Sequence, residues 1–522
     1  MKLSSFGESF NSLKEHSILV YQTRAKHRSF VQHMTRTLTV LVLLAIGVLV
    51  ASLPSCTLEE DFLTDANAEV RLGLDTLRFD TVFTEVGSTT QFFKVFNPHN
   101  QPLNLKRVSV ENNAGGRFRI NVDGRSGDEI TEVFIAPGDS IFVFVEVTVD
   151  PDDDISVSPF VFEGRVVVEA TEQRQIVVLE AFGQNANYIP ADRTRANFGF
   201  LSCDFGEVVF DDPKPYVLYG SLVIDSCTLT LPPGTQLYVH GGLVNNPDFG
   251  VFNDGLIIVQ GAGRLNIMGT EEQPVLIASD RVEEEFIDVG GQYSGIRLGA
   301  GTGPHTITHA RIRNGIVGVF VDSLATLNID HTEIAYTTGA GIVGFAANVN
   351  ASNISVHSNG GGALQAILGG RYRVDYSTFV NFGSRNPAVI ITNGFQIDNS
   401  TFLVNQMDAI FRNSIIFGSL NDEFAVGDFD EPNLLNYQLT NSILKSTNVP
   451  NDRPEFQDNC TSCFFPPRDS ALFLNVQADS FQLDTLSFAQ GRALPIMGID
   501  DDLIGTARDA VAPDVGAYER VD

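Results

Sequence analysis

The sequence predicts an all-β protein in which an immunoglobulin-like β-sandwich is followed by a parallel β-helix. Beyond Cys56, helical periodicity is almost absent, and short alternating apolar runs are punctuated by Gly, Asn, Asp and Pro. Six or seven such runs fill residues 74–187, and a repeat of 22–23 residues runs through much of the chain beyond them. A chain of 522 residues is also too long for one ordinary core, so at least two domains are expected.

The N-terminal region carries an apolar run of 16 residues from Leu38 to Leu53. A membrane-spanning helix needs roughly 20 apolar residues, so this run fits the core of a signal peptide better. Met34 stands just ahead of it. We therefore predict that translation starts at Met34, that residues 34–55 are a signal peptide and that residues 1–33 are a start-site artefact. The alternative for residues 1–33 is a cytoplasmic leader.

The four residues LPSC, ending at Cys56, resemble the lipobox of bacterial lipoproteins, although proline at the second position departs from the usual Ala or Ser. The resemblance implies lipidation of Cys56 and an anchor in the outer membrane. The alternative is an ordinary secretory signal with an incidental cysteine. The acids EED at 59–61 resemble the tag that exports Bacteroidota lipoproteins to the cell surface. Residues 56–73 are then an acidic tether.

The overall charge restricts the class of partner. The chain has 34 Lys and Arg against 64 Asp and Glu, a formal net charge of −30. Nucleic acid and anionic lipid headgroups both need a basic surface on the protein that binds them. We therefore expect no nucleic-acid partner.

Four cysteines remain if Cys56 is lipidated. They fall as two close pairs, Cys203 with Cys227 and Cys460 with Cys463, and in an oxidising compartment the expectation is two disulfides. The CxxC spacing of the second pair is also compatible with a redox-active pair or half of a zinc site. No second CxxC and no adjacent βαβ pattern supports either alternative.

Residues 74–187 are expected to form the sandwich. Runs such as QFFKVF, SIFVFVEVTV and QIVVLEAFG alternate apolar and polar residues, and turn signals separate them. The segments FTEVGSTTQFFKVFNPHNQPL and IAPGDSIFVFVEVTVDP also resemble the Ig-like modules at the base of many bacterial surface proteins. The block carries no catalytic or cofactor motif, so we interpret it as a spacer or adaptor.

The repeat that follows predicts the β-helix. Five segments close on an apolar residue at intervals of 22, 22, 23 and 23, the length of one coil. They are TITHARI (306–312), NIDHTEI (328–334), NASNISV (350–356), RVDYSTF (373–379) and QIDNSTF (396–402). Equivalent residues of successive coils should stack about 4.8 Å apart. This predicts inward columns at 307/329/351/374/397 and 312/334/356/379/402, continuing to Ile416 and Leu444.

Flanking segments extend the resemblance. LTLPPGTQLYV, DGLIIVQGAGRLNIMGTEEQPVLIAS and the closing DVGAYE resemble right-handed β-helix lipoproteins of Bacteroidota. The resemblance implies a right-handed, single-stranded solenoid. On this basis residues 188–215 are a linker and N-terminal cap, residues 216–445 the β-helix and residues 446–522 a C-terminal capping segment.

A polar ladder is expected at one bend of the coils. Asn tolerates left-handed backbone geometry and stacked amides can hydrogen-bond to one another. The ladder positions are His309, His331, Asn353, Tyr376, Asn399, Asn413 and Asn441. A metal held by His309 and His331 is the alternative, but no third ligand aligns with them.

The outward positions supply the candidate catalytic residues. Asp375 and Asp398 should lie on adjacent coils, and paired carboxylates can share proton transfer or hold a hard cation such as Ca²⁺. Arg371 and Arg373 are a close pair that could contact an acidic substrate. A solvated strand face is the competing interpretation, and we expect no resident cofactor.

Three functional classes follow. The first is a lipid-anchored envelope protein whose β-helix is a non-catalytic structural or binding module for a neutral glycan or a protein. The second is a polysaccharide lyase or glycoside hydrolase, and the third is a subunit of a larger outer-membrane complex. Residues 216–445 carry 21 Asp and Glu against 10 Lys and Arg, and such an excess repels a uronate chain. The non-catalytic class is therefore favoured.

Overall fold

A computed structural model describes the chain over fourteen ranges. They are 62–63, 68–83, 90–113, 116–148, 160–184, 186–189, 198–201, 203, 206–246, 250–398, 401–429, 434–446, 458–467 and 471–520. The expected signal peptide, the start at Met34 and the lipidated Cys56 lie outside these ranges. Within them, no helix is long and apolar enough to cross a membrane.

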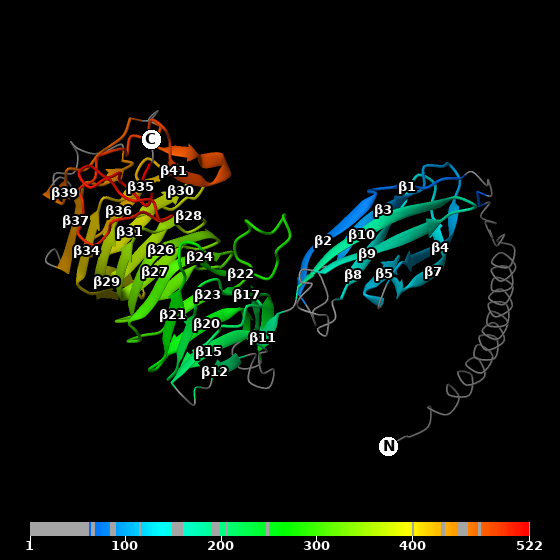
Figure 1. The fold of residues 1–522 in the computed structure, drawn as a ribbon, viewed down its shortest axis with the longest axis horizontal. Helices are drawn as coiled ribbons and strands as arrows, with labels where there is room; N and C mark the ends of the chain where they lie inside the picture. Colours follow the sequence, from blue (N-terminus) through cyan, green and yellow to red (C-terminus); the bar gives the residue numbers. More distant parts are fainter. Residues whose placement is uncertain are drawn as a thin grey trace, which may run out of the picture.

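The N-terminal unit is a β-sandwich of two five-stranded sheets (Figure 1). One sheet has the order β1 (Arg71–Leu72), β3 (Gln91–Phe96), β8 (Ser140–Val147), β5 (Phe118–Val122) and β6 (Arg125–Gly127). The other has the order β2 (Thr76–Phe83), β10 (Arg174–Gln184), β9 (Phe160–Glu169), β4 (Leu103–Glu111) and β7 (Glu129–Ile135).

The core of the sandwich comes from alternate residues of its strands. In β8 the buried residues are Val143, Val145 and Val147, while the residues between them are exposed. They pack with Val108 and Phe118 in one apolar cluster. The alternation that the sequence shows is therefore the alternation of core and solvent faces.

The second unit is a solenoid of parallel strands, which confirms the predicted β-helix fold (Figure 1). Three long ladders form its faces, named here in chain order within a coil. Face 1 contains β12 (Phe198–Leu201), β15 (Ser221–Asp225), β20 (Leu256–Gln260), β23 (Gly295–Leu298), β25 (Val319–Val321), β31 (Val389–Thr392) and β36 (Phe424–Gly427). Face 2 contains β13 (Glu207–Val209), β16 (Thr228–Leu231), β21 (Arg264–Met268), β34 (Met407–Arg412), β37 (Leu435–Thr440) and β39 (Cys460–Thr461).

Face 3 completes each coil. It contains β11 (Asn187–Ile189), β14 (Tyr216–Tyr219), β17 (Gln236–His240), β22 (Val275–Ser279), β28 (Ser355–Asn359), β30 (Thr378–Asn381), β35 (Ile415–Gly418) and β38 (Ile443–Leu444). Four long strands bend and serve two faces each. β24 (His305–Arg313) and β26 (Thr326–Thr337) run from face 2 to face 3, and β27 (Ile342–Ser352) and β29 (Leu364–Asp375) run from face 1 to face 2.

The first coil starts earlier in the sequence than expected. Strands β11, β12 and β13 pair in parallel with β14, β15 and β16. Part of residues 188–215, which we expected to be a linker and cap, therefore forms a coil of its own. The disulfide between Cys203 and Cys227 joins this coil to the next one, and a second disulfide joins Cys460 and Cys463 at the far end. Both expected disulfides are present.

The interior of the solenoid is built from stacked columns. One column runs through Ile312, Ile334, Val356, Phe379, Ile416 and Leu444. All six side chains are buried in one cluster. Each inward residue stacks on its counterparts in the neighbouring coils, so the interior is continuous along the solenoid.

The prediction that residues 397 and 402 belong to these columns is wrong. They lie in or beside an antiparallel hairpin, β32 (Gly394–Gln396) and β33 (Phe402–Val404), inserted between face 1 and face 2. Ile397 and Phe402 are exposed. Phe411 takes the expected place of Ile397 beside Val374, and Ile416 takes that of Phe402 beside Phe379. A second hairpin, β18 (Leu243–Asn246) and β19 (Gly250–Asn253), is inserted between β17 and β20.

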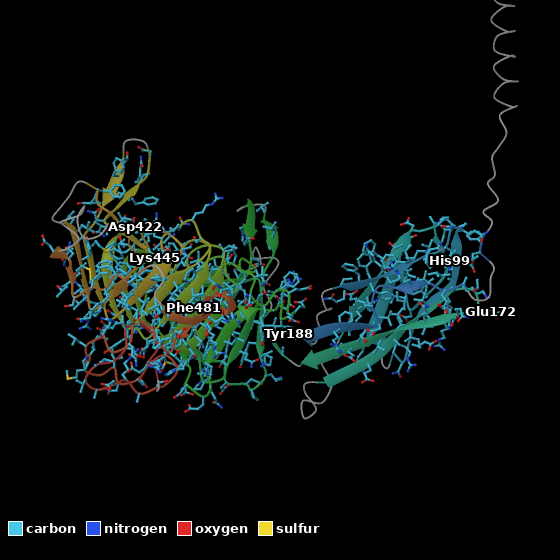
Figure 2. All side chains as sticks on the ribbon, turned by 90° about the horizontal axis from the view of Figure 1, so that it is seen from above. His99, Glu172, Tyr188, Asp422, Lys445 and Phe481 are labelled. Atoms are coloured by element: carbon cyan, nitrogen blue, oxygen red, sulfur yellow. A yellow bond between two sulfur atoms is a disulfide. The ribbon has the colours of Figure 1, made fainter. Side chains whose placement is uncertain are left out.

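Residues 471–520, here called the C-terminal segment, cover the flank of face 3. The segment contains β40 (Phe473–Asn475), the short 3-10 helix η5 (Val476–Ala478) and β41 (Ser480–Leu483). Its apolar side chains pack on outward residues of face 3, including Val380 and Ile415. Figure 2 labels Phe481, which lies where this segment meets the solenoid. The segment expected to be a cap therefore also covers a side of the coils.

Candidate functional site

The bend between face 2 and face 3 carries the predicted polar ladder. Its residues have positive φ angles of 43° to 52°, the left-handed region in which Asn is better tolerated than most residues. They are His309, His331, Asn353, Tyr376, Asn413 and Asn441. Asn399 falls outside the described residues, and the ladder passes from Tyr376 to Asn413. One left-handed residue per coil thus turns the chain sharply from face 2 into face 3.

The two histidines of the ladder stack on each other. Their ring centroids lie 4.4 Å apart with an angle of 20° between the planes. His331 is held on both sides, with Nδ1 2.7 Å from Asp330 and Nε2 3.2 Å from Asp501 of the C-terminal segment. Among the described residues, no group of three or more His, Cys, Asp or Glu side chains could hold a metal ion.

A groove of about 500 Å³ lies on the outer surface of face 2, beside the ladder. Its floor is two rows of outward side chains from successive coils, β24, β26, β27 and β29. One row is Thr306, Asn328, Asn350 and Arg373, and the other is Thr308, Asp330, Ser352 and Asp375. Ile499 of the C-terminal segment closes one side. We define these nine residues as the groove.

Asp375 lies in the groove, but it does not face another carboxylate. The next coil places Arg412 beside it, and two Arg412 nitrogens donate to the two Asp375 oxygens at 2.6 Å. This hydrogen bond raises the pKa of Arg412 further above its ordinary value. The predicted pairing of Asp375 with Asp398 is wrong, because Asp398 sits at the exposed turn of the hairpin β32–β33.

The arginine pair is also committed to an internal partner. The guanidinium of Arg373 lies 2.7 Å from Asp408, and that of Arg371 lies 4.0 Å from the same carboxylate. Asn436 donates to the second Asp408 oxygen at 3.0 Å. Arg371 and Arg373 therefore share one carboxylate, and Arg373 is the one that it holds closely.

Asp330 is the remaining carboxylate of the groove, and it is paired as well. Partial burial would raise the pKa of Asp330, but hydrogen bonds from His331 and from Ser352 outweigh it and the pKa lies below its ordinary value. For His331, burial would lower the pKa, and the contacts with Asp330 and Asp501 raise it overall. The groove acid is therefore ionised and held by a hydrogen-bond donor on each oxygen.

The other groove side chains are uncharged hydrogen-bonding groups. Asn350 donates to Asn328 at 2.8 Å, and each amide keeps further donor and acceptor capacity toward solvent. Thr306 and Thr308 add two hydroxyls on the preceding coil. Their regular spacing, one coil of about 4.8 Å, follows from the strand spacing of the sheet.

Sequence reasoning missed Arg412 and Asp408 as partners. The motif NS at 399–400 and the motif NS at 413–414 fit the ladder equally well as sequences, and the structure places Asn413 at the ladder position that follows Tyr376. A register based on Asn413 would have placed Arg412 next to Asp375. The 14-residue step between the two motifs was the available signal of an insertion.

No family model matches the chain, and no curated protein matches it. Among solved structures, it is similar to a protein of unknown function from Porphyromonas gingivalis, at 16% identity over 22% of this chain and 46% of that one, with a TM-score of 0.17. It is also similar to a family 123 glycoside hydrolase from Clostridium perfringens, at 7% identity over 43% of this chain and 63% of that one, with a TM-score of 0.17.

A third similar structure is the catalytic domain of a GH87 α-1,3-glucanase, at 9% identity over 67% of this chain and 80% of that one, with a TM-score of 0.16. The chain spans between 46% and 63% of the length of the first three structures that it matches. At these identities and TM-scores, the similarities carry no information about substrate or activity.

Proposed function

We propose that this protein is a lipid-anchored cell-surface protein whose β-helix binds an uncharged polysaccharide along the groove of face 2 without cleaving it. The observation that carries the proposal is the pairing of every groove carboxylate. Asp375 is held by Arg412, and Asp330 is held by His331 and Ser352. What remains for a ligand is a surface of amides and hydroxyls.

Catalytic cleavage of a glycosidic bond places different demands on a site. Two carboxyl groups must flank the bond, one of them protonated at neutral pH and the other free to act as nucleophile or base. Asp330 has a lowered pKa, which disfavours its protonation. Asp375 accepts a charge-assisted hydrogen bond from Arg412 on each of its two oxygens, which ties the carboxylate to the next coil and disfavours its use as a nucleophile or base.

Binding of an uncharged chain is what the geometry favours. The rows of Asn, Thr and Ser extend along the solenoid axis, so an extended polymer could contact several coils at once. A uronate chain would have to compete with Asp375 for Arg412 and with Asp408 for Arg373, because these acids already hold the two guanidiniums. The ligand class that fits is therefore a neutral polysaccharide.

Affinity electrophoresis in native gels tests this function. We expect at least one of laminarin, xyloglucan and starch to slow the protein, and polygalacturonate to leave its mobility unchanged. Replacing Asn328 and Asn350 together by Ala should weaken the retardation at least about tenfold, because each amide loses hydrogen bonds to the sugar. The exposed Gln260→Ala on face 1 is the matched control and should behave as the parent protein.

The same samples distinguish binding from hydrolysis. If new reducing ends accumulate with time, the protein is a glycoside hydrolase and not a binding module. If the double variant of Asn328 and Asn350 is retarded as strongly as the parent protein, the polysaccharide binds elsewhere than on face 2.

A further inference from the structure

A second concavity of about 550 Å³ lies between face 3 and the C-terminal segment. Its floor comes from the face 3 ends of β24 and β26 and from β28, and its roof comes from residues 478–482 and 503–504. It shares no residue with the groove of face 2. We name it the flank cavity.

Some polar groups of the flank cavity are already paired. Glu333 lies 3.1 Å from Nε2 of His357, whose ring centroid lies 4.7 Å from that of Phe481. Asp479 accepts hydrogen bonds from Tyr336 at 2.9 Å and from a serine hydroxyl at 2.7 Å. These pairs fix the roof over the floor.

Other polar groups line the cavity and still have donors or acceptors free for hydrogen bonds to a ligand. His309 stacks on the neighbouring ladder histidine, and no hydrogen bond joins its ring or the carboxylate of Glu271 to any residue that the structure describes. The guanidinium of Arg311 reaches only 3.8 Å from Glu333. Glu271 lies directly against Gly505, which has a φ of +79° and no space for a Cβ.

The charge of the cavity disfavours an anionic ligand. Three carboxylates, Glu271, Glu333 and Asp479, line it against Arg311 and His331, whose raised pKa favours its charged form. Burial lowers the pKa of His309, and the charge of the adjacent ladder histidine lowers it further, which favours the neutral ring. The ring then offers one N–H donor and one acceptor nitrogen.

The apolar part of the cavity suits the carbon face of a sugar ring. Ile504 is 45% exposed and Tyr518 is partly exposed, while the ring of Phe481 is buried in the core of the C-terminal segment. Carboxylate acceptors, N–H donors and the apolar wall of Ile504 and Tyr518 together match a molecule with several hydroxyls on one side and C–H groups on the other. A simple organic cation would use the carboxylates but leave Arg311 and His309 unused.

We propose that the flank cavity is a second carbohydrate site, which takes one or two uncharged sugar units, such as the end of a glycan chain. The sugar hydroxyls donate to Glu271 and Glu333 and accept from Arg311 and His309, and the carbon face of the ring packs on Ile504 and Tyr518. The cavity and the groove of face 2 share no lining residue, and they adjoin where His331 of the cavity hydrogen-bonds to Asp330 of the groove.

Histidine NMR tests the proposal on the full-length chain. Resonances of ring C–H groups are followed while cellobiose, maltose or lactose is added, and those of His309 and His357 are assigned from single variants. We expect at least one disaccharide to shift both. Glu271→Gln and His309→Asn should each weaken that binding about tenfold, since the first replaces a charge-assisted hydrogen bond by a neutral one and the second replaces the ring by a shorter side chain.

Glu272→Gln is the matched control, because Glu272 is the exposed neighbour of Glu271 and does not line the cavity. It should leave the affinity unchanged, as should the paired Asn328 and Asn350 substitutions on face 2. Glu271 is itself exposed, so its variant should fold normally. The proposal is overturned if none of the disaccharides shifts the histidines, if ethylenediamine shifts them instead, or if the face 2 variant abolishes the effect.

Discussion

Phe379 and Phe402 provide a test of how the coils are stacked. The sequence places both in one inward column, but the structure buries Phe379 completely and leaves Phe402 48% exposed in a hairpin. Phe379 stacks between Val356 and Ile416, and its ring centroid lies 6.3 Å from that of Phe411. Truncation to Ala would leave a cavity in a close-packed interior, which costs about 3–5 kcal/mol.

The same truncation at Phe402 removes a ring that is half in solvent. Substitutions at such positions usually change stability by about 0.5 kcal/mol or less, although the contact of Phe402 with Phe429, at 5.6 Å between centroids, makes a small loss reasonable. The free energy of unfolding of both variants can be measured by urea denaturation with tyrosine fluorescence as the signal, since the chain has no tryptophan. Equal losses for the two variants would refute the column that the structure assigns.

The remaining predictions concern the flank and the anchor. The pKa of His331 is raised in the folded state, so its contribution to docking of the C-terminal segment is complete below about pH 6.5 and is lost as the pH rises through the folded value. The protection factors for hydrogen exchange around Asp501, which correct for the intrinsic rise of the exchange rate with pH, should fall about two- to fivefold from pH 6 to pH 9, the modest effect of a half-exposed pair. His331→Asn should remove this fall in protection. Arg508→Ala should destabilise the C-terminal segment by about 3–5 kcal/mol, because it leaves the buried carboxylate of Glu519 without the guanidinium that lies 3.4 Å away. Limited proteolysis should then cut near residue 508. Unchanged resistance to the protease would contradict this role of Arg508. Cys56→Ala should release the protein from membranes, and full retention of that variant in the membrane fraction would end the lipoprotein hypothesis.

Local patterns explain why much of the fold was predictable. Alternation within a strand and a constant step between coils both follow from a parallel sheet, so Ile312, Ile334, Val356 and Phe379 were placed in one column correctly. The left-handed bend was equally predictable from the sequence, since Asn413 lies at the same bend as Asn353 and His331, two and three coils earlier. These features depend on neighbours that are near in sequence or one repeat away.

The rest depends on insertions and on contacts between distant segments. The hairpin β32–β33 lengthens one coil, so the partner of Asp375 lies 37 residues away rather than 23. The flank cavity needs the C-terminal segment, whose Asp501 meets His331 across 170 residues. No periodicity in the sequence reports where such a segment folds back, so neither the pairing of the groove acids nor the second cavity was foreseen.

The most direct measurement for the central claim is a hydroxyl-radical footprint of the full-length chain with and without a saturating uncharged polysaccharide that retards it in gels. We expect reduced labelling of the groove, in peptides that carry residues 305–308, 326–330 and 347–352 and in the peptide that contains Ile499, with no release of reducing ends. Protection confined to face 1 or to the sandwich, or cleavage of the polymer during the incubation, would contradict a non-catalytic binding surface on face 2.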